Sequence, residues 1–363
     1  METNPVWGVL LSWLGGLAGA SFYVPFRKVR GWSWETYWLV FGAFSMIVVP
    51  WLFAAIFTHD LTSVLHEARS STLLLTYGFG VLFGVGSLTF GLTLRYLGMS
   101  LGMALAMGNC AVFGTLVPPI FHGQFGQLLA RRSGIVTLVG VTVCILGIVL
   151  AGAAGVSKEN ELTDELKQAS IKEFNLKLGV ALGIFSGVMS ACFAFGLEAG
   201  NSISALTMMH GTGNVWQGLL VMALVLLGSY TTNSVWCLRL GMRNRTYGEY
   251  LQGPQDDKGT SVPADTGQGG LSVFNYVFCA VAGCIWYLQF FFYSMGTSQL
   301  GKYAFSGWTL LMASIIIFST LWGIAVKEWQ GVSARTTALV TLTLFTLVGS
   351  TVIVGYGNYL GSH

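Results

Sequence analysis

Charged side chains are scarce in this chain. Only 9% of its 363 residues are Asp, Glu, Lys or Arg, whereas 53% are hydrophobic. An average soluble domain carries about 25% charged residues, so the deficit leaves too little polar surface for a soluble protein. The composition therefore excludes the soluble globular classes and predicts an integral membrane protein.

Motifs of nucleotide, redox and catalytic chemistry are missing as well. The sequence has no GxxxxGK[ST] phosphate-binding loop, which argues against a nucleotide-driven pump. Its six cysteines form no CxxC pair, so neither a metal site nor a redox motif is predicted. No Ser/His/Asp, paired-carboxylate or metal-ligand cluster falls at membrane depth. These absences disfavour an enzyme or a sugar sensor, and no cofactor, metal or nucleic-acid partner is expected.

What the sequence has in abundance is long apolar runs. Each run of about 20 residues can cross a hydrocarbon core of about 30 Å as a helix. The runs are continuous rather than alternating, which favours helices over a β-barrel. Spans are predicted near residues 7–26, 34–57, 72–94, 98–121, 134–155, 178–199, 213–238, 271–295, 303–326 and 336–358.

The predicted spans divide into two groups of five. Because five is odd, the second group enters the membrane from the opposite side, as in many secondary transporters. The expected fold is an all-α integral membrane protein with ten transmembrane helices as two inverted five-helix repeats. The expected units are residues 1–156, a cytoplasmic linker at 157–177, and residues 178–363 with a flexible cytoplasmic loop at 239–270.

The distribution of basic residues predicts the orientation. Of the 18 Lys and Arg residues, only Arg69, Arg131, Arg132 and Lys302 fall in the loops of one side, and the other fourteen fall on the opposite side. Positively charged loops stay in the cytoplasm. Both termini are therefore predicted on the outer, periplasmic side.

Two acidic residues at span ends are candidates for proton coupling, because ionisable residues in membrane segments are costly and often functional. Glu35 follows Trp32, Ser33 and Trp34 at the start of the second span. Aromatic neighbours could desolvate its carboxyl group; alternatively, Ser33 caps the helix and the carboxylate favours its positive end. Glu198, near the outer end of the sixth span, is the second candidate, with a solvated rim residue as the alternative.

A site for a neutral sugar needs uncharged hydrogen-bonding side chains and an aromatic wall. Asn109 lies near the centre of the fourth span, while Trp286, Gln289 and Tyr293 share one face of the eighth because they are three and four residues apart. Interhelical hydrogen bonding with an interfacial aromatic belt is the alternative interpretation. The substrate-binding candidates are Asn109, Trp286, Gln289, Tyr293, Tyr23 and Ser190.

Five segments resemble the L-rhamnose-proton symporter family of the drug/metabolite transporter superfamily. They are Phe22–Val29 (FYVPFRKV), Trp32–Thr36 (WSWET), Phe90–Ser100 (FGLTLRYLGMS), Trp286–Tyr293 (WYLQFFFY) and Lys327–Trp329 (KEW). The resemblance touches both halves of the chain. It implies the ten-helix fold of that superfamily, a place in the inner membrane, and uptake of a 6-deoxyhexose, most of all L-rhamnose, together with a proton.

The resulting hypothesis is a secondary active transporter that imports L-rhamnose with a proton by alternating access. Its expected partners are a small sugar, a proton and the lipid bilayer. An exporter or uncoupled facilitator for another sugar or small metabolite on the same fold is the alternative, and it needs no titratable residue. Sugar-stimulated alkalinisation of the outside medium is predicted only by the first hypothesis.

Overall fold

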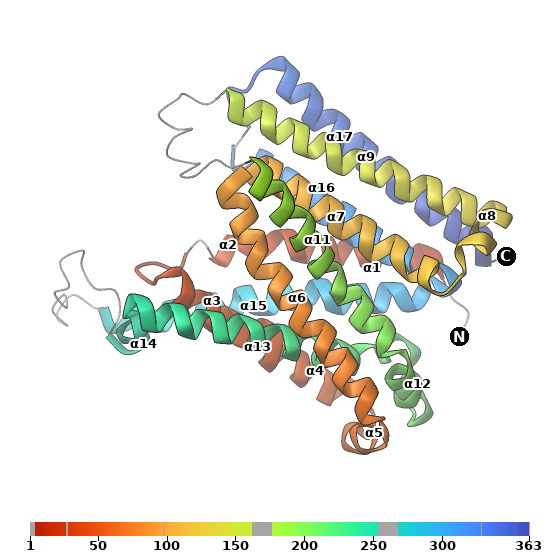
Figure 1. Ribbon diagram of the computed structural model, residues 1–363, viewed down its shortest axis with the longest axis horizontal. Coiled ribbons are helices and arrows are strands. Elements are labelled where there is room, and N and C mark those ends of the chain that lie inside the picture. The colour runs from red at the N-terminus through yellow and green to blue at the C-terminus, as the bar shows by residue number, and fades with distance from the viewer. Residues whose placement is uncertain are drawn as a thin grey trace.

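The chain folds into a bundle of long helices that run side by side (Figure 1). The computed structural model describes residues 4–26, 28–97, 99–161, 176–252, 268–327 and 329–362, and no strand occurs within these ranges. The long helices are α1 (Pro5–Ser21), α6 (Ser70–Leu97), α7 (Met99–Phe121), α9 (Arg132–Asn160), α11 (Leu176–Ala199), α13 (Leu219–Asn244), α15 (Gln268–Gln299), α16 (Ser306–Ala325) and α17 (Ala334–Ser362).

The second predicted span is built from three consecutive segments: α3 (Trp34–Gly42), the π-helical η1 (Ala43–Val48) and α4 (Val49–Phe57). Short helices occupy the connections between the long ones. They are α2 (Tyr23–Phe26), α5 (Leu61–Glu67), α8 (Phe125–Ala130), α12 (Asn201–Met209), η2 (Asn214–Trp216), η3 (Thr246–Gly248), α14 (Glu249–Gln252) and η5 (Gly301–Tyr303).

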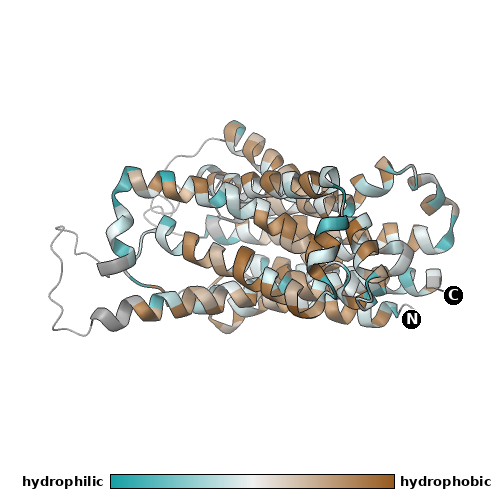
Figure 2. Cartoon of the chain, turned by 90° about the horizontal axis from the view of Figure 1, so that it is seen from below, coloured by the Kyte–Doolittle hydropathy of each residue, from teal (hydrophilic) through white to brown (hydrophobic). Residues whose placement is uncertain are grey.

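The bundle has the dimensions and surface of a membrane protein. Within the described residues, nine helical segments are long and apolar enough to cross a membrane, and a shorter apolar segment covers Leu105–Phe121 of α7. Apolar residues dominate the middle of the bundle, and hydrophilic residues gather toward its two ends (Figure 2). The prediction of an all-α membrane protein is thereby confirmed.

The two ends of the bundle carry different short helices. Both termini lie at one end, here called the termini end, together with α5, α8 and α12 (Figure 1). The start of α3 and helix α14 lie at the opposite end, here called the far end. Because α13 continues to Asn244 and is followed by η3 and α14, the loop predicted at 239–270 begins later than expected. Residues 253–267 and 162–175, the rest of that loop and most of the linker, lie outside the described residues.

Small residues let several helices approach closely. A Cβ atom on Gly15 of α1 would lie 2.8 Å from the backbone oxygen of Gln289 on α15. A Cβ atom on Gly84 of α6 would lie 2.8 Å from the backbone oxygen of Ser229 on α13. Larger side chains at either glycine would push these helix pairs apart.

The long helices pack in a defined set of pairs. Helix α9 lies along α17, α6 packs on both α11 and α13, α1 packs on both α15 and α16, and α7 packs on α11 and α9. The largest apolar core cluster lies where α11, α13, α15 and α16 meet, and it includes Phe193, Phe290, Tyr293 and Trp308. This aromatic centre lies between the polar ends.

Candidate functional site

Glu35 is a buried carboxylate in the first turn of α3. Its side chain is 4% exposed, and its Oε1 atom accepts hydrogen bonds from Asn244 Nδ2 at 2.9 Å and Thr246 Oγ1 at 3.2 Å. No Lys, Arg or His forms an ion pair with it in the described part of the chain. A buried carboxylate with only neutral donors can gain or lose a proton without breaking an ion pair.

A second carboxylate, Glu249 of α14, contacts the same helix start. Glu249 Oε2 accepts hydrogen bonds from the backbone N–H and the hydroxyl of Ser33, both at 2.8 Å. Ser33 occupies the N-cap position of α3 as predicted, but its hydroxyl makes no bond to the helix backbone. The carboxylate of a distant segment therefore caps this helix. Beside it, burial raises the pKa of Tyr250 to about 12, so that phenol stays neutral.

Glu198 lies at the other end of the bundle, in a much wetter setting. Its Oε1 atom is 3.2 Å from His122 Nε2, and each side chain is 44% exposed. It also lies close enough to Tyr293 of α15 for an electrostatic interaction. The pairing with His122 joins the end of α11 to the segment after α7, and it leaves both groups in contact with solvent.

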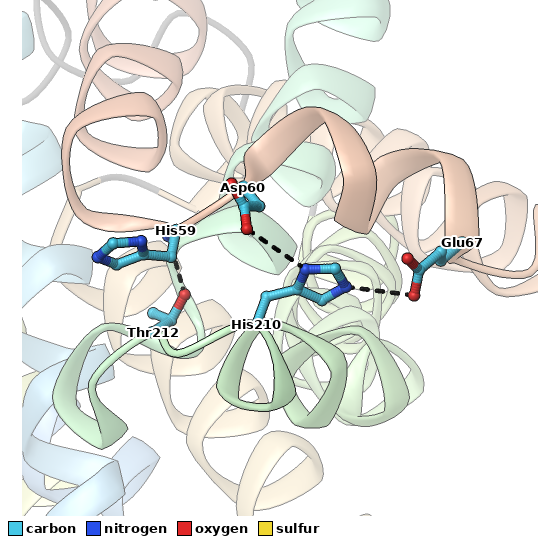
Figure 3. Close-up of polar contacts among 5 residues, drawn as sticks. All are labelled: His59, Asp60, Glu67, His210 and Thr212. Atoms are coloured by element: carbon cyan, nitrogen blue, oxygen red, sulfur yellow. Dashed lines mark hydrogen bonds and ion pairs between the residues drawn. The ribbon is translucent and has the colours of Figure 1, made fainter.

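A second histidine contact occurs at the termini end (Figure 3). His210 Nε2 lies 3.2 Å from Glu67 Oε2, and His210 Nδ1 lies 3.8 Å from Asp60 Oδ2. Nearby, Thr212 Oγ1 accepts a hydrogen bond from the backbone N–H of His59. Searched across the described residues, no group of three or more His, Cys, Asp and Glu side chains is arranged to hold a metal ion.

An aromatic cluster occupies the centre of the bundle. Phe193 of α11 packs against both Phe290 of α15, at 4.3 Å between ring centroids, and Trp308 of α16, at 5.5 Å. The ring of Tyr293 meets Trp308 edge-on at 5.6 Å, and Trp308 Nε1 donates to the backbone oxygen of Cys110 on α7. Four helices thus contribute to one apolar wall of the kind that a sugar ring stacks on.

Three polar side chains, two on α15 and one on α7, make few hydrogen bonds or none in the described part of the chain. Gln289 and Tyr293 are 5% and 6% exposed, yet neither side chain has a hydrogen-bond partner among the residues that the structure describes. Asn109 is half-buried next to Cys110, and its amide donates only to the backbone oxygen of Leu105, one turn away. Buried polar groups are normally paired, so Gln289 and Tyr293 are exceptions within the described part of the bundle.

The other predicted substrate residues lie further from this centre. Trp286 is half-buried and packs on Phe290, at 4.8 Å, and on Phe41 of α3. Ser190 is half-buried where α11 crosses α6 at Gly86. Tyr23 is 57% exposed and packs beside Phe22 and Phe26. The structure brings Tyr293 to the aromatic cluster. Asn109 lies where α7 meets Gly187 of α11, the side-chain amide of Gln289 faces Gly19 of α1, and Tyr23 stays at the surface.

One buried polar network was missed from the sequence. Asn233 of α13 is 2% exposed, and its Oδ1 atom accepts hydrogen bonds from Trp38 Nε1 at 3.1 Å and Ser87 Oγ at 3.3 Å. Its Nδ2 atom donates to the backbone oxygen of Ser229 at 2.8 Å. An asparagine inside an apolar span was the available signal, because polar residues there usually link helices.

These features define a class. A helical bundle whose middle is apolar, whose ends are polar and whose long helices can cross a membrane is a multi-pass membrane protein.

The family follows from comparison with known proteins. The family model for the L-rhamnose-proton symport protein matches residues 1–359, so the chain belongs to this family of transporters. Proteins named L-rhamnose-proton symporter from Cronobacter sakazakii and Pectobacterium carotovorum are each 32% identical, over 96% and 98% of this chain and 97% and 99% of their own length. One from Yersinia pestis is 31% identical over 98% of this chain and 99% of its own length. The resemblance seen in the sequence is confirmed.

Proposed function

We propose that this protein imports L-rhamnose together with a proton by alternating access. Family membership and the names of the relatives support the substrate and the coupling ion. The observation that carries the proposal is the environment of Glu35, which is buried at the end of a membrane span and which, in the described part of the chain, is bound by neutral donors alone. A transporter that acts without an ion gradient needs no such group.

Glu35 is the proposed proton-binding residue, and Glu198 is the weaker candidate. Glu35 is buried and accepts hydrogen bonds from Asn244 and Thr246, so a proton on its carboxyl group would change these contacts. Glu198, by contrast, pairs with His122, and both side chains contact solvent. The far end, where Glu35 lies, is proposed to be cytoplasmic, with both termini on the outer side of the inner membrane.

The sugar is proposed to bind at the aromatic cluster. Hydroxyl groups of L-rhamnose would pair with the uncommitted amides of Gln289 and Asn109 and the hydroxyl of Tyr293. The apolar face and the methyl group would pack on Phe193, Phe290 and Trp308. Ser190, Trp286 and Tyr23 are proposed as outer contributors. Binding without bond cleavage is all that these groups provide, which supports transport rather than enzymatic turnover.

Helix packing supports the ten-helix arrangement with two inverted repeats, residues 1–156 and 178–363. A shift of five spans relates α1 to α11, the α3–α4 segment to α13, α6 to α15, α7 to α16, and α9 to α17. Under this shift the α6–α11 pair corresponds to α15–α1, the α7–α11 pair to α16–α1, and the α7–α9 pair to α16–α17. All six pairs occur. The α9–α17 and α3–α13 pairs correspond to themselves, as expected for contacts on a two-fold axis.

Uptake of radiolabelled L-rhamnose into proteoliposomes tests the proposed function. Uptake is measured with and without an imposed inward proton gradient, in competition with L-mannose, L-fucose and L-lactate. We expect accumulation above equilibrium only with the gradient, and inhibition by the sugars but not by lactate. Equal uptake with and without the gradient would indicate an uncoupled facilitator. No rhamnose uptake by folded protein would reject the substrate.

A further inference from the structure

The partners of Glu35 belong to one short segment, residues 244–250, here called the strap. It comprises the last residue of α13, the helix η3 and the start of α14. Arg245 reverses the chain with a left-handed backbone, at φ 58°, which brings Thr246 back toward α3. Non-glycine residues rarely adopt this conformation, so the contacts on either side of the turn hold it.

Separate contacts anchor the strap to its neighbours. Tyr247 donates a hydrogen bond to the backbone oxygen of Leu238 on α13 at 2.7 Å. Tyr276 of α15 donates to the backbone oxygen of Tyr250 at 3.1 Å. The strap is therefore fixed on α13 and α15 by bonds that involve no carboxylate.

The polar contacts between the strap and α3 have a different character, because two carboxylates take part in them; the phenol of Tyr250 adds a neutral contact with the Thr36 hydroxyl of α3. Asn244 and Thr246 donate to Glu35 of α3, and Glu249 of the strap accepts from Ser33 at the start of α3. Each contact weakens when its carboxylate binds a proton, since a protonated carboxyl group is a poorer acceptor. Asn244 is exposed, so solvent lies directly beyond the bond that it donates.

We propose that Asn244 and Thr246 are positioning residues for the proton step: they hold Glu35 as a carboxylate, and protonation of Glu35 releases α3 from the strap. This inference rests on the proposed role of Glu35. The ligand that Glu35 binds is the proton, and binding of the proton moves α3 relative to α13 at the far end. Among the described residues, Tyr37 on α3 and Cys237 on α13 interact electrostatically with Glu35. Glu249 and Tyr250 lie on the strap itself, and Tyr276 and Cys279 of α15 contact Tyr250 and Tyr37.

The first test measures the pH dependence of L-rhamnose uptake in proteoliposomes. The double variant Asn244→Ala/Thr246→Val keeps Glu35 and removes both donors. Because the donors favour the carboxylate, their loss should let Glu35 bind its proton at higher pH. We expect the pH of half-maximal uptake to rise by at least about one unit, because two hydrogen bonds to a charged group are lost. Thr246→Ser with Asn244 unchanged keeps both donors and should retain the original midpoint.

The matched control uses a similar contact at another helix start. Glu161 accepts hydrogen bonds from Ser333 and Thr336 at the beginning of α17. Thr336→Val removes one donor to that carboxylate without touching the strap. We expect no change in the pH midpoint. An equal shift in this control would show that the effect is not specific to Glu35.

The second test follows the release of α3 directly, through a native thiol. Cys237 of α13 is 2% exposed and lies within electrostatic range of Glu35. At one fixed pH, its alkylation by N-ethylmaleimide is measured by peptide mass spectrometry in the full-length protein. We expect at least a threefold faster reaction in Glu35→Gln and in the double variant, with Cys144 of α9 unchanged.

The outcomes separate the inference from the proposed function. If Glu35→Gln retains proton-driven accumulation, Glu35 is not the proton site and the proposed role fails. If Glu35→Gln uncouples transport but the double variant changes neither the pH midpoint nor Cys237 alkylation, the strap inference alone is overturned. Loss of all rhamnose exchange in the double variant, with exchange intact in Glu35→Gln, would also overturn it, because the strap would then be needed for more than the proton step.

Discussion

The two ends of the bundle each hold one of the carboxylates predicted as proton sites, and the two differ in every physical respect. Glu35 at the far end is 4% exposed and bound by the uncharged donors Asn244 and Thr246. Glu198 at the termini end is 44% exposed and paired with His122. The comparison teaches that position at a span end does not select a coupling residue. We propose that burial and neutral partners do, because a proton on such a carboxyl group changes the hydrogen bonds around it.

The largest effect is expected at Glu35. A gradient of two pH units is worth about 2.7 kcal/mol per proton, or about a hundredfold accumulation of sugar. Glu35→Gln should abolish this accumulation while retaining exchange of labelled for unlabelled L-rhamnose across the membrane. Gradient-driven uptake and exchange are measured in the same proteoliposomes. Retained accumulation in Glu35→Gln would show that proton coupling does not need Glu35, and the proposed functional difference between the two ends would fail.

Gln289 tests the sugar site without touching either carboxylate. Its buried amide has no partner in the described part of the chain, so Gln289→Leu should leave the stability unchanged or raise it. Loss of one hydrogen bond to the sugar should raise the KM for L-rhamnose about tenfold. Thermal unfolding and uptake kinetics give the two values. An unchanged KM would place Gln289 outside the sugar site.

Asn233 is the structural counterpart to Gln289, because its amide is fully committed. Asn233→Leu leaves Trp38 Nε1 unpaired and breaks the contact with Ser87. We expect a loss of about 1–2 kcal/mol in stability with the KM for L-rhamnose within about twofold of the original. Denaturation in detergent and uptake kinetics measure these changes. A selective rise in KM would instead assign Asn233 to the sugar site.

Glu198 should respond weakly. An exposed ion pair contributes about 0–1 kcal/mol, so Glu198→Gln should keep proton-driven accumulation and lower the unfolding temperature only slightly. Parallel uptake by Glu35→Gln in the same experiment supplies the contrast. If Glu198→Gln uncouples transport, Glu198 rather than Glu35 is the proton-coupling residue.

The smallest effect concerns Glu161, outside the spans. Hydrogen bonds, first from the Ser333 hydroxyl and then from Thr336 and the Ser333 backbone N–H, lower the pKa of its carboxyl group. A carboxyl group with a lowered pKa adds stability above its ordinary pKa and loses that contribution as the pH falls through the lowered value. Glu161→Gln should therefore lower the unfolding temperature slightly at pH 7 and have no effect at strongly acidic pH. An equal change at both values would contradict this assignment.

The spans were largely predictable because hydropathy is a local property. Residues 34–57 were predicted as one span, and α3, η1 and α4 together cover these residues. Trp286 and Tyr293 were likewise recognisable in the sequence as aromatic residues on one helix face. Sequence distance explains what was missed: Asn244 and Thr246 are 209 and 211 residues from Glu35, so no local pattern links them.

The polar contacts between helices were the least predictable part of the site. The pairing of His122 with Glu198 depends on where α7 and α11 end in space, which no local pattern gives. The loop was predicted to start at residue 239 because Gly, Arg and Asn residues, which are common in loops, follow the seventh span. Helix α13 instead continues to Asn244. Partners on α3 stabilise that extra turn, and they are contributed by the fold rather than by the local sequence.

The most direct test of the account is the proton movement evoked by the sugar. Proteoliposomes that contain a pH-sensitive dye, without an imposed gradient, receive external L-rhamnose, and internal pH is followed for the original protein and for Glu35→Gln. The account predicts acidification inside the vesicles of the original protein, and sugar entry without acidification in Glu35→Gln. Equal acidification in both would contradict the assignment of proton coupling to Glu35.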